Sequence, residues 1–139
     1  MPHYEATLDS VKSHPLPQWY SDAKFGIWSH WGPQSVPMYG DWYARHMYVQ
    51  DHPQYLYHVR HYGHPSKFGY KDFIPLFKGE KFDADAWVAL AKRAGMKYMV
   101  VTTKHHDGFC MFDAHNTEWK VTNTPFDHNA TAEITTAFE

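Results

Sequence analysis

Apolar residues recur at helical spacing in the segment from residue 83 to residue 94. They occupy positions i, i+3, i+4 and i+7 and would form one apolar face: Trp87, Leu90, Ala91 and Ala94. Asp83 can accept a hydrogen bond from the free backbone amides of a first turn, and Gly95 can adopt the left-handed conformation that often ends a helix. The pattern therefore predicts a helix over residues 83–94.

Two short apolar runs predict strands, one well before this helix and one just after it. Residues 24–30 are mostly apolar and are followed by the turn-forming Trp31-Gly32-Pro33, which indicates a buried strand. Residues 98–103 are continuously apolar and then polar, as is typical of a strand buried on both faces of a parallel sheet. The order strand, helix, strand predicts a βαβ unit with a long first connection, and hence an α/β fold with parallel strands.

Weaker patterns predict further helical segments. Pro53 suits the first turn of a helix over residues 53–62, and Gly63 suits its end. Three other segments have helical character: residues 4–13, 72–77 and 131–138. Since no internal repeat or linker divides the chain, we expect residues 1–139 to form a single domain.

The composition supports a folded protein and narrows the classes of function. Of the 139 residues, 43% are hydrophobic and 20% are charged, which excludes a disordered or low-complexity chain. The net charge of −2 provides no basic surface for nucleic acid or for a membrane. The N-terminus lacks a signal-peptide pattern and no apolar run is long enough to span a bilayer, so we expect a soluble protein, in the cytoplasm or in a compartment that the sequence does not identify.

Two kinds of side chain are unusually frequent. Aromatic residues make up 18% of the chain, and such rings either fill a core or line a cleft for a flat or sugar-like ligand. The chain also has 12 histidines, whose protonation around their usual pKa of about 6.5 would make its net charge depend strongly on pH.

Polar side chains gather where the two predicted strands end. His30 ends the first strand, and His105, His106 and Asp107 follow the second. In parallel α/β folds ligands bind at the C-terminal ends of the strands, so we expect these side chains on one rim. Neutral imidazole offers one hydrogen-bond donor and one acceptor, which suits sugar hydroxyls. The same residues could instead be structural or hold a metal ion; no H-E-x-x-H pattern supports the metal, and we predict no metal or other cofactor.

A second candidate lies in the segment Tyr39-Gly40-Asp41-Trp42-Tyr43. A carboxylate beside aromatic rings is a typical arrangement for binding a pyranose, because the carboxylate accepts hydrogen bonds from the hydroxyls and a ring packs on the apolar face of the sugar. The alternative is a loop that only closes a core, and the spacing does not distinguish the two.

Together these motifs resemble the α-L-fucosidases of glycoside hydrolase family 29. The resemblance extends over about residues 17–127 and rests on four motifs in the family's order: Trp19–Gly32 (WYSDAKFGIWSHWG), Ser35-Val36-Pro37, Asp41-Trp42-Tyr43 and Thr102–Phe109 (TTKHHDGF). It implies a (β/α)8 TIM-like barrel, of which this chain would form the N-terminal portion. It also implies removal of terminal α-L-fucose from fucosylated glycans or oligosaccharides with retention of configuration, and leaves transfer to other sugars open.

The resemblance implies roles for single residues. His30, His105 and His106 match histidines that bind the fucose hydroxyls. Asp41 and Trp42 match an acidic residue and a tryptophan that hold the sugar, although the family usually has Glu at the position of Asp41. Two further residues match positions that wall the pocket: Tyr39 and Trp28, the latter in place of what is commonly a smaller aromatic.

The catalytic carboxyl groups are the largest departure from the family. Retaining glycosidases need two carboxyl groups about 5–5.5 Å apart, one as nucleophile and one as acid/base. The family places both after later strands, beyond the end of this chain. If the chain is active, another carboxylate must act, and position favours Asp107, then Asp41, then Glu118. The alternatives are a fucose-binding module without catalysis, an inactive fragment, and a metal-dependent hydrolase.

The length of the chain bears on its assembly. Two parallel strands with one crossover helix cannot bury themselves, and a (β/α)8 barrel normally takes about 250 residues. Open sheet edges invite pairing with another copy. The sequence therefore predicts a homo-oligomer that completes the partial barrel.

Overall fold

A parallel pair of strands lies at the centre of the molecule. The computed structural model describes residues 4–139. Strand β1 (Ile27–Ser29) pairs in parallel with β2 (Met99–Val101), with Ile27 opposite Met99 and Ser29 opposite Val101. Helix α5 (Ala84–Arg93) lies between them in the chain and connects them. The predicted βαβ unit and its parallel strands are confirmed.

The strongest helix predictions are also confirmed, including their ends. Asp83 caps α5 by accepting a hydrogen bond from the amide of Ala86 at 2.8 Å, and Gly95 follows it with φ 79°. Helix α4 spans Pro53–Tyr62, and Gly63 ends it with φ 87°. Proline within the first turn and glycine after the last are therefore reliable boundaries here.

The remaining elements are short. They are α1 (Leu8–Lys12), α2 (Gln18–Ala23), α3 (Tyr43–His46), α6 (Ala130–Phe138) and three 3-10 segments, Pro33–Ser35, Tyr70–Leu76 and Val121–Asn123. The predicted turn at residues 72–77 overlaps the second 3-10 segment, and the predicted helix at 131–138 corresponds to α6. Nothing in the pattern predicts α2 or α3, since both are about one turn of helix and lack a full apolar face.

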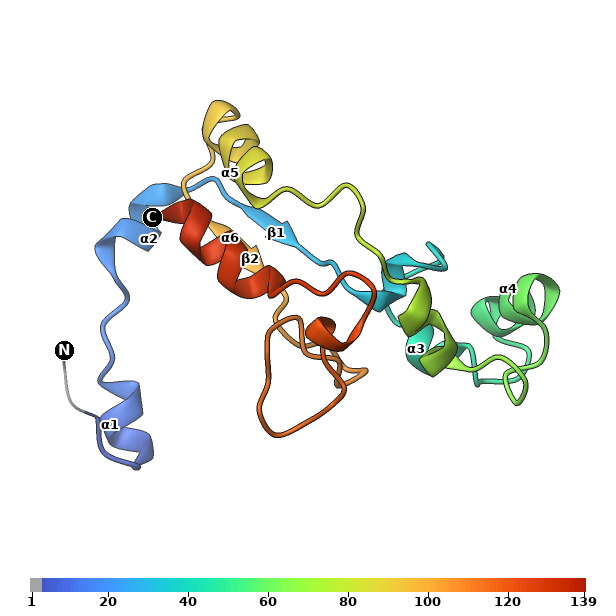
Figure 1. Cartoon of the computed structure of the whole chain (residues 1–139). Coiled ribbons are helices and arrows are strands. Elements are labelled where there is room, and N and C mark those ends of the chain that lie inside the picture. The colour runs from blue at the N-terminus through green and yellow to red at the C-terminus, as the bar shows by residue number, and fades with distance from the viewer. Residues whose placement is uncertain (1–3) are drawn as a thin grey trace.

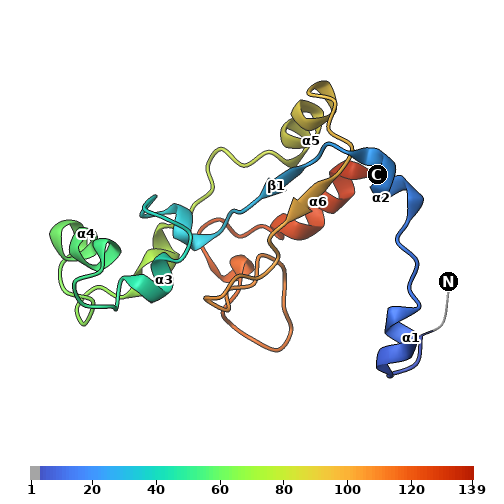
Figure 2. The same cartoon turned by 180° about the vertical axis from the view of Figure 1, so that it is seen from behind.

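The helices occupy distinct positions around the strands (Figure 1). Helices α5 and α6 contact each other, and α6 crosses one face of the strand pair. The opposite face is turned to the viewer in Figure 2, where no helix crosses it. Helices α3 and α4 lie beyond the C-terminal end of β1, and α1 stands apart near the other end of the molecule. Among residues 4–139, no helix combines the length and the apolar character needed to cross a membrane.

Both strands are more exposed than the sequence predicts. Trp28 and Val100 are opposite each other on the uncovered face and are 71% and 43% exposed, and Ile27 is 38% exposed. The predictions of a buried first strand and of a second strand buried on both faces are therefore wrong for this chain. The apolar residues at 98–101 are typical of a strand that is covered on both faces. In the part of the chain that the structure describes, however, only the face toward α6 is covered.

The apolar face of α5 differs from the predicted one. Val88 and Ala91 are buried, whereas Leu90 is 58% exposed and Ala94 is exposed. Trp87 and Leu90 instead line an apolar hollow together with Ile27 and Met99. The helical spacing identifies an apolar face correctly, but it does not show that part of this face lacks a covering neighbour.

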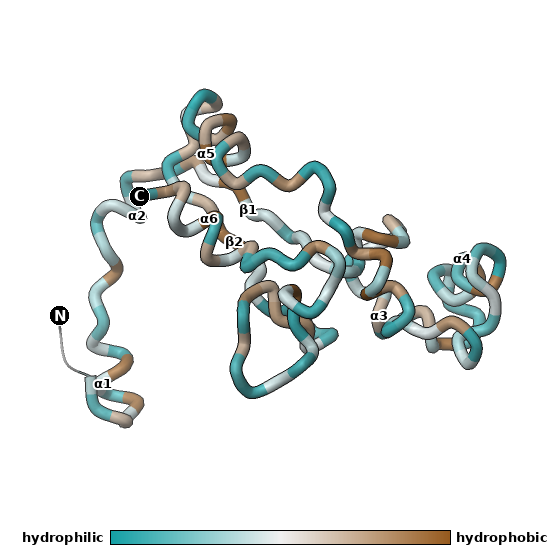
Figure 3. The backbone as a smooth tube through the Cα atoms, viewed as in Figure 1, coloured by the Kyte–Doolittle hydropathy of each residue, from teal (hydrophilic) through white to brown (hydrophobic). Residues whose placement is uncertain are grey.

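The core lies in the connections rather than between the strands. One buried cluster joins the connection after β2 to the segment before α5, and consists of Phe77, Phe109, Met111, Val121, Phe126 and Ala130. The other packs α3 against the second 3-10 segment and consists of Tyr43, Met47, Tyr70 and Phe73. The outer part of the connection between β2 and α6 is largely hydrophilic (Figure 3). These aromatic clusters hold the loops that follow the strands, and those loops carry the candidate site.

Candidate functional site

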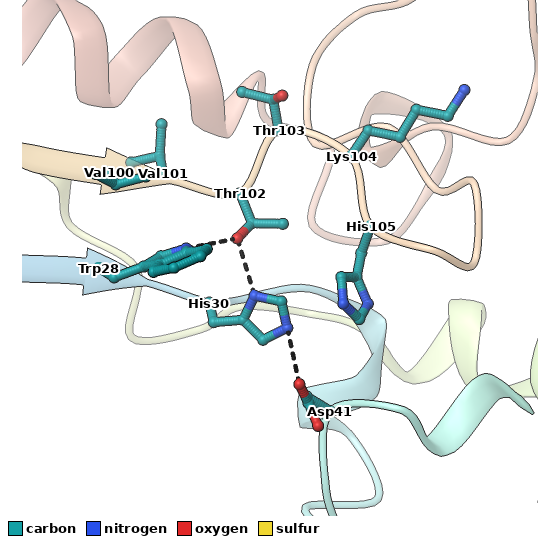
Figure 4. Close-up of a pocket in the computed structure, with 9 residues that line it drawn as sticks. All are labelled: Trp28, His30, Asp41, Val100, Val101, Thr102, Thr103, Lys104 and His105. Atoms are coloured by element: carbon teal, nitrogen blue, oxygen red, sulfur yellow. Dashed lines mark hydrogen bonds and ion pairs between the residues drawn. The ribbon is translucent and has the colours of Figure 1, made fainter. Parts of the chain in front are cut away.

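A pocket of about 630 Å³ opens at the C-terminal ends of β1 and β2. We call it the strand-end pocket, and Figure 4 shows its lining: Trp28, His30, Asp41, Val100, Val101, Thr102, Thr103, Lys104 and His105. Strand β1 leads into His30 and strand β2 into Thr102, so residues distant in sequence meet at this rim. This is the place where parallel α/β folds bind ligands.

His30 is held by Thr102 and points toward Asp41 (Figure 4). Nδ1 of His30 lies 3.0 Å from the Thr102 hydroxyl, which also accepts a hydrogen bond from the Trp28 indole at 3.4 Å. Because that hydroxyl already accepts from Trp28, it can donate its own proton to Nδ1. In the tautomer whose Nδ1 accepts this proton, the ring proton of His30 sits on Nε2, which faces the Asp41 carboxylate at 3.6 Å.

His105 is the second imidazole of the pocket. Its ring packs edge-on against that of His30, with centroids 4.3 Å apart. Burial lowers the pKa of His105, and the neighbouring His106 and His30 lower it further. His105 is therefore neutral at physiological pH and offers one donor and one acceptor.

Two buried ring nitrogens at this site have no hydrogen-bond partner among the described residues. They are Nε2 of His30 and Nδ1 of His105. Buried polar atoms are nearly always paired, so two such atoms together indicate that a ligand or water completes them. This observation points to a polar ligand in the strand-end pocket.

The other predicted sugar residues lie beside the strand-end pocket rather than in its lining. Trp42 stacks on His106 with ring centroids 4.3 Å apart and an angle of 10°, and lies 6.2 Å from His105. Tyr39 stacks on Tyr57 at 4.0 Å and lines a neighbouring pocket. The structure thus brings His30, His105, Asp41 and Trp28 together, with His106 and Trp42 adjacent.

Asp107 and Glu118 are engaged in other contacts. The Asp107 carboxylate accepts hydrogen bonds from the Tyr70 hydroxyl at 2.7 Å and from the Phe109 amide at 2.9 Å. Burial raises the pKa of Tyr70, and the hydrogen bond to Asp107 raises it further, so this hydroxyl stays protonated as a donor. Glu118 accepts from the Asn123 side chain at 2.7 Å. Neither carboxylate lines the strand-end pocket, and both hold loop structure.

Three side chains of the pocket could also bind a metal ion. Ligand atoms of His30, Asp41 and His105 lie within 4.8 Å of one another, and nitrogen and oxygen ligands of this kind suit zinc. The predicted set of three histidines and one aspartate is assembled only in part, because its aspartate is Asp41 rather than Asp107 and His106 stacks on Trp42 instead. The same atoms are equally suited to hydroxyl groups.

Thr102 is a site residue that sequence reasoning does not single out. Its hydroxyl orients His30 and contacts Trp28, although it lies in β2's extension and they lie in β1 and just after it. The available signal is the change from apolar to polar residues after Val101. A polar residue at a strand end can orient a ligand-binding side chain of the neighbouring strand, although its own residue type does not indicate a binding role.

Comparison with known proteins decides the family. A family model described as Alpha-L-fucosidase matches residues 1–139. The chain belongs to the alpha-L-fucosidase family. The tissue alpha-L-fucosidase of Bos taurus is 43% identical to it over 109 residues, which are 78% of this chain and 23% of that protein. The chain thus spans about a quarter of the length of the curated fucosidases that it matches.

Solved fucosidase structures share its fold. The alpha-fucosidase of Thermotoga maritima in complex with fucose superposes with a TM-score of 0.89 and 34% identity, over 97% of this chain and 34% of that one. Alpha-L-fucosidase isoenzyme 1 from Paenibacillus thiaminolyticus superposes with a TM-score of 0.69 and 36% identity, over 87% of this chain and 25% of that one. These neighbours have a TIM-barrel catalytic domain, and the parallel strands of this fucosidase-family chain are consistent with part of such a barrel.

Proposed function

We propose that this chain carries the fucose-binding part of an α-L-fucosidase, and that its strand-end pocket takes the terminal α-L-fucose of a glycan. The observation that supports this most directly is the pair of buried ring nitrogens without partners, Nε2 of His30 and Nδ1 of His105. Sugar hydroxyls both donate and accept, so they can satisfy these two atoms. The fucose complex of the Thermotoga maritima relative supports the same ligand class.

Each residue has a distinct task in this proposal. His30 donates from Nε2 to a fucose hydroxyl, and Asp41, 3.6 Å away, accepts a hydrogen bond from a neighbouring hydroxyl. His105, kept neutral by burial, supplies a second donor and acceptor pair. The indole of Trp28, 71% exposed on the open face of the strands, provides an apolar wall for the sugar ring. His106 and Trp42 form the rim beside these residues.

The proposed reaction is hydrolysis with retention, which needs two carboxyl groups about 5–5.5 Å apart. Among the described residues that line the strand-end pocket, Asp41 is the one carboxylate. Asp41 is therefore a better candidate for the catalytic carboxylate than Asp107, because the oxygens of Asp107 accept hydrogen bonds from Tyr70 and Phe109. A single carboxylate performs half of the retaining mechanism, so the proposed role of this chain is to bind and orient fucose beside a carboxyl group from outside the described pocket.

We also propose that a second copy of the chain covers the apolar hollow beside α5. The support is the apolar surface left there, which includes the hollow lined by Ile27, Leu90 and Met99, with Leu90 58% exposed. Burying such surface is favourable by about 25 cal/mol per Å². Light scattering of the 139-residue chain at micromolar concentration tests this, and a well-folded monomer would contradict it.

Isothermal titration calorimetry with L-fucose tests the proposed function. We expect binding by the unaltered chain and a loss of at least tenfold in affinity for His105→Asn. The matched control is His115→Asn, the same change at an exposed histidine outside the pocket, which should bind normally. Circular dichroism establishes that both variants fold. No fucose binding by the folded, unaltered chain would overturn the proposal.

Turnover separates catalysis from binding alone. Release of the aglycone from an activated aryl α-L-fucoside supports a glycosidase, whereas fucose affinity without release supports a fucose-binding module. Binding that survives treatment with EDTA excludes a role for metal held by His30, Asp41 and His105.

A further inference from the structure

A separate pocket of about 370 Å³ lies beyond the C-terminal end of β1, in the part of the molecule that holds α3 and α4 (Figure 1). We call it the α4 pocket. Its lining residues follow α3, lie on α4 or follow α4: Tyr48, Gln50, Tyr55, His64, Pro65 and Ser66. None of these residues lines the strand-end pocket or the pocket beside it at Tyr39. The α4 pocket is therefore distinct from the proposed fucose site.

The Tyr48 ring forms an exposed wall of the α4 pocket. The side chain is 53% exposed, and its hydroxyl accepts a hydrogen bond from the backbone amide of Tyr70 at 2.8 Å. This bond ties the end of the side chain to the second 3-10 segment and so restricts rotation of the ring. A ring that is already fixed offers its apolar face to a ligand at little cost in side-chain entropy.

Tyr55 and Pro65 supply the rest of the apolar surface. Tyr55 lies half-buried on α4, and its ring meets that of His64 edge-on, with centroids 6.4 Å apart and an angle of 88°. Pro65 is buried and follows His64 in the chain. Aromatic and apolar surface beside polar side chains is typical of sites that cover the apolar face of a sugar ring.

His64 and Ser66 give the pocket hydrogen-bonding groups of defined direction. Nδ1 of His64 accepts from the Ser66 backbone amide at 3.2 Å and lies 2.8 Å from the Ser66 hydroxyl. A backbone amide can only donate, so in the neutral ring the proton of His64 lies on Nε2. The Ser66 hydroxyl then donates to Nδ1, which leaves its oxygen able to accept. The exposed Gln50 amide adds a further donor and acceptor.

The charge of the lining restricts the kind of ligand. Among the described residues that line the α4 pocket, none is a lysine, an arginine, an aspartate or a glutamate. A charged ligand therefore lacks an opposite charge in the lining, which a strong ionic contact requires. A neutral ligand with several hydroxyl groups can instead use the donors and acceptors of His64, Ser66 and Gln50.

We propose that the α4 pocket is a second carbohydrate site, which binds a neutral pyranose independently of the strand-end pocket. Its volume of about 370 Å³ is near the lower end of the range for small-molecule pockets, which suits a single sugar ring. The inference goes beyond the proposed function, because it requires no fucose in the strand-end pocket. A glycan held at this second site has a raised effective concentration at the first.

NMR titration tests the proposal and locates binding on the chain. The probes are the methyl glycosides of galactose, glucose and N-acetylglucosamine, and the ring signals of Tyr48, Tyr55 and His64 report on the α4 pocket. We expect saturable shifts of these signals with at least one probe, with a Kd of roughly 1–10 mM, as for a small ligand held by a few hydrogen bonds. No saturable shift of these signals with any probe, at concentrations well above this range, overturns the inference.

His64→Ala is the decisive variant, because it removes the Nε2 donor and one ring of the edge-on pair. The Kd of the probe that binds, read from the Tyr48 and Tyr55 signals, should rise about three- to tenfold. His115→Ala, the same change at an exposed histidine outside the pocket, should leave the Kd unchanged. An unchanged Kd in the folded His64→Ala variant overturns the inference. If that variant does not fold, Gln50→Ala takes its place with the same expectation and the same criterion.

The same spectra distinguish failure of this inference from failure of the proposed function. The ring signals of His30 and His105 report on the strand-end pocket when L-fucose is added. If they shift while the signals of the α4 pocket respond to no probe, the inference fails and the proposed function stands. If the α4 pocket responds to a pyranose while His30 and His105 do not respond to fucose, the inference stands and the proposed function fails.

Discussion

The Thr102 hydroxyl lies 3.0 Å from Nδ1 of His30, although the two residues are 72 positions apart in the sequence. This contact links the ends of β1 and β2, and when the hydroxyl donates to Nδ1 the ring proton of His30 lies on Nε2, which faces Asp41. A residue that need not touch the ligand thus sets the hydrogen-bonding direction of one that does.

Thr102→Val should weaken fucose binding by about three- to tenfold, because the shape of the side chain is kept but the hydroxyl that orients His30 is lost. Thr102→Ser restores the hydroxyl and should recover most of the affinity. Calorimetry with L-fucose measures both. Equal losses in the two variants would indicate a packing role and contradict the assignment of Thr102 as a positioning residue.

The two aspartates near the strand ends should respond differently to replacement by asparagine. Asp41→Asn should lower fucose affinity about tenfold while leaving the free energy of unfolding nearly unchanged, because its side chain is largely exposed. Asp107→Asn should lower the free energy of unfolding by about 1–3 kcal/mol, because two groups donate to its carboxylate and an amide can accept on one side only. Urea unfolding and fucose titration of both variants make the comparison. A loss of fucose affinity in Asp107→Asn, with a loss of stability in Asp41→Asn, would contradict this assignment and identify Asp107 as the residue that contacts the ligand.

Much of the fold follows from local rules of the sequence. The ends of α5 are marked by Asp83 and Gly95, and those of α4 by Pro53 and Gly63. These ends can be predicted because capping and left-handed turns depend on the residue itself. Exposure does not follow in the same way. Whether Trp28, Val100 and Leu90 are covered depends on which other segments pack against them. A local run of apolar residues does not identify those segments.

The candidate site could be predicted in its location but not in its detail. The ends of two parallel strands bring His30 and His105 together, and topology alone requires this. That Asp41 rather than Asp107 joins them depends on the path of the loop after β1 and on the Tyr70 hydroxyl, which engages Asp107. The part played by Thr102 depends on side-chain hydrogen bonding between strands, which has no periodic signature.

Gly40 should be more sensitive to substitution than Gly63, although both have positive φ values. Gly63→Ala should lower the free energy of unfolding by about 1 kcal/mol, because a Cβ there meets no atom within 4 Å and only the backbone is strained. Gly40→Ala should cost about 2 kcal/mol or more, because its Cβ also collides with the Gln54 side chain. Urea unfolding of both variants gives the difference. Equal losses would contradict the prediction, because they would mean that the loop or the Gln54 side chain moves to accept the Cβ at no cost in stability.

Acid should destabilise the chain through His58. This side chain is fully buried, with Nδ1 2.9 Å from the Tyr43 hydroxyl and Nε2 2.8 Å from the Phe68 carbonyl. Burial lowers its pKa below the ordinary 6.5, more than the Phe68 carbonyl raises it. The unfolded chain therefore takes up a proton more readily than the folded one, so this contribution to stability is complete above about pH 6.5 and is lost as the pH falls below it.

Thermal unfolding at pH 7.5 and pH 5.5 measures the effect, and the unaltered chain should have the lower Tm at pH 5.5. His58→Gln keeps a donor and an acceptor but cannot titrate, so its Tm should depend less on pH, whatever its value. His61→Gln, at an exposed histidine of the same helix, should keep the dependence of the unaltered chain. If His58→Gln and His61→Gln show the same dependence, the acid sensitivity arises elsewhere, because the two differ chiefly in whether the replaced imidazole was buried.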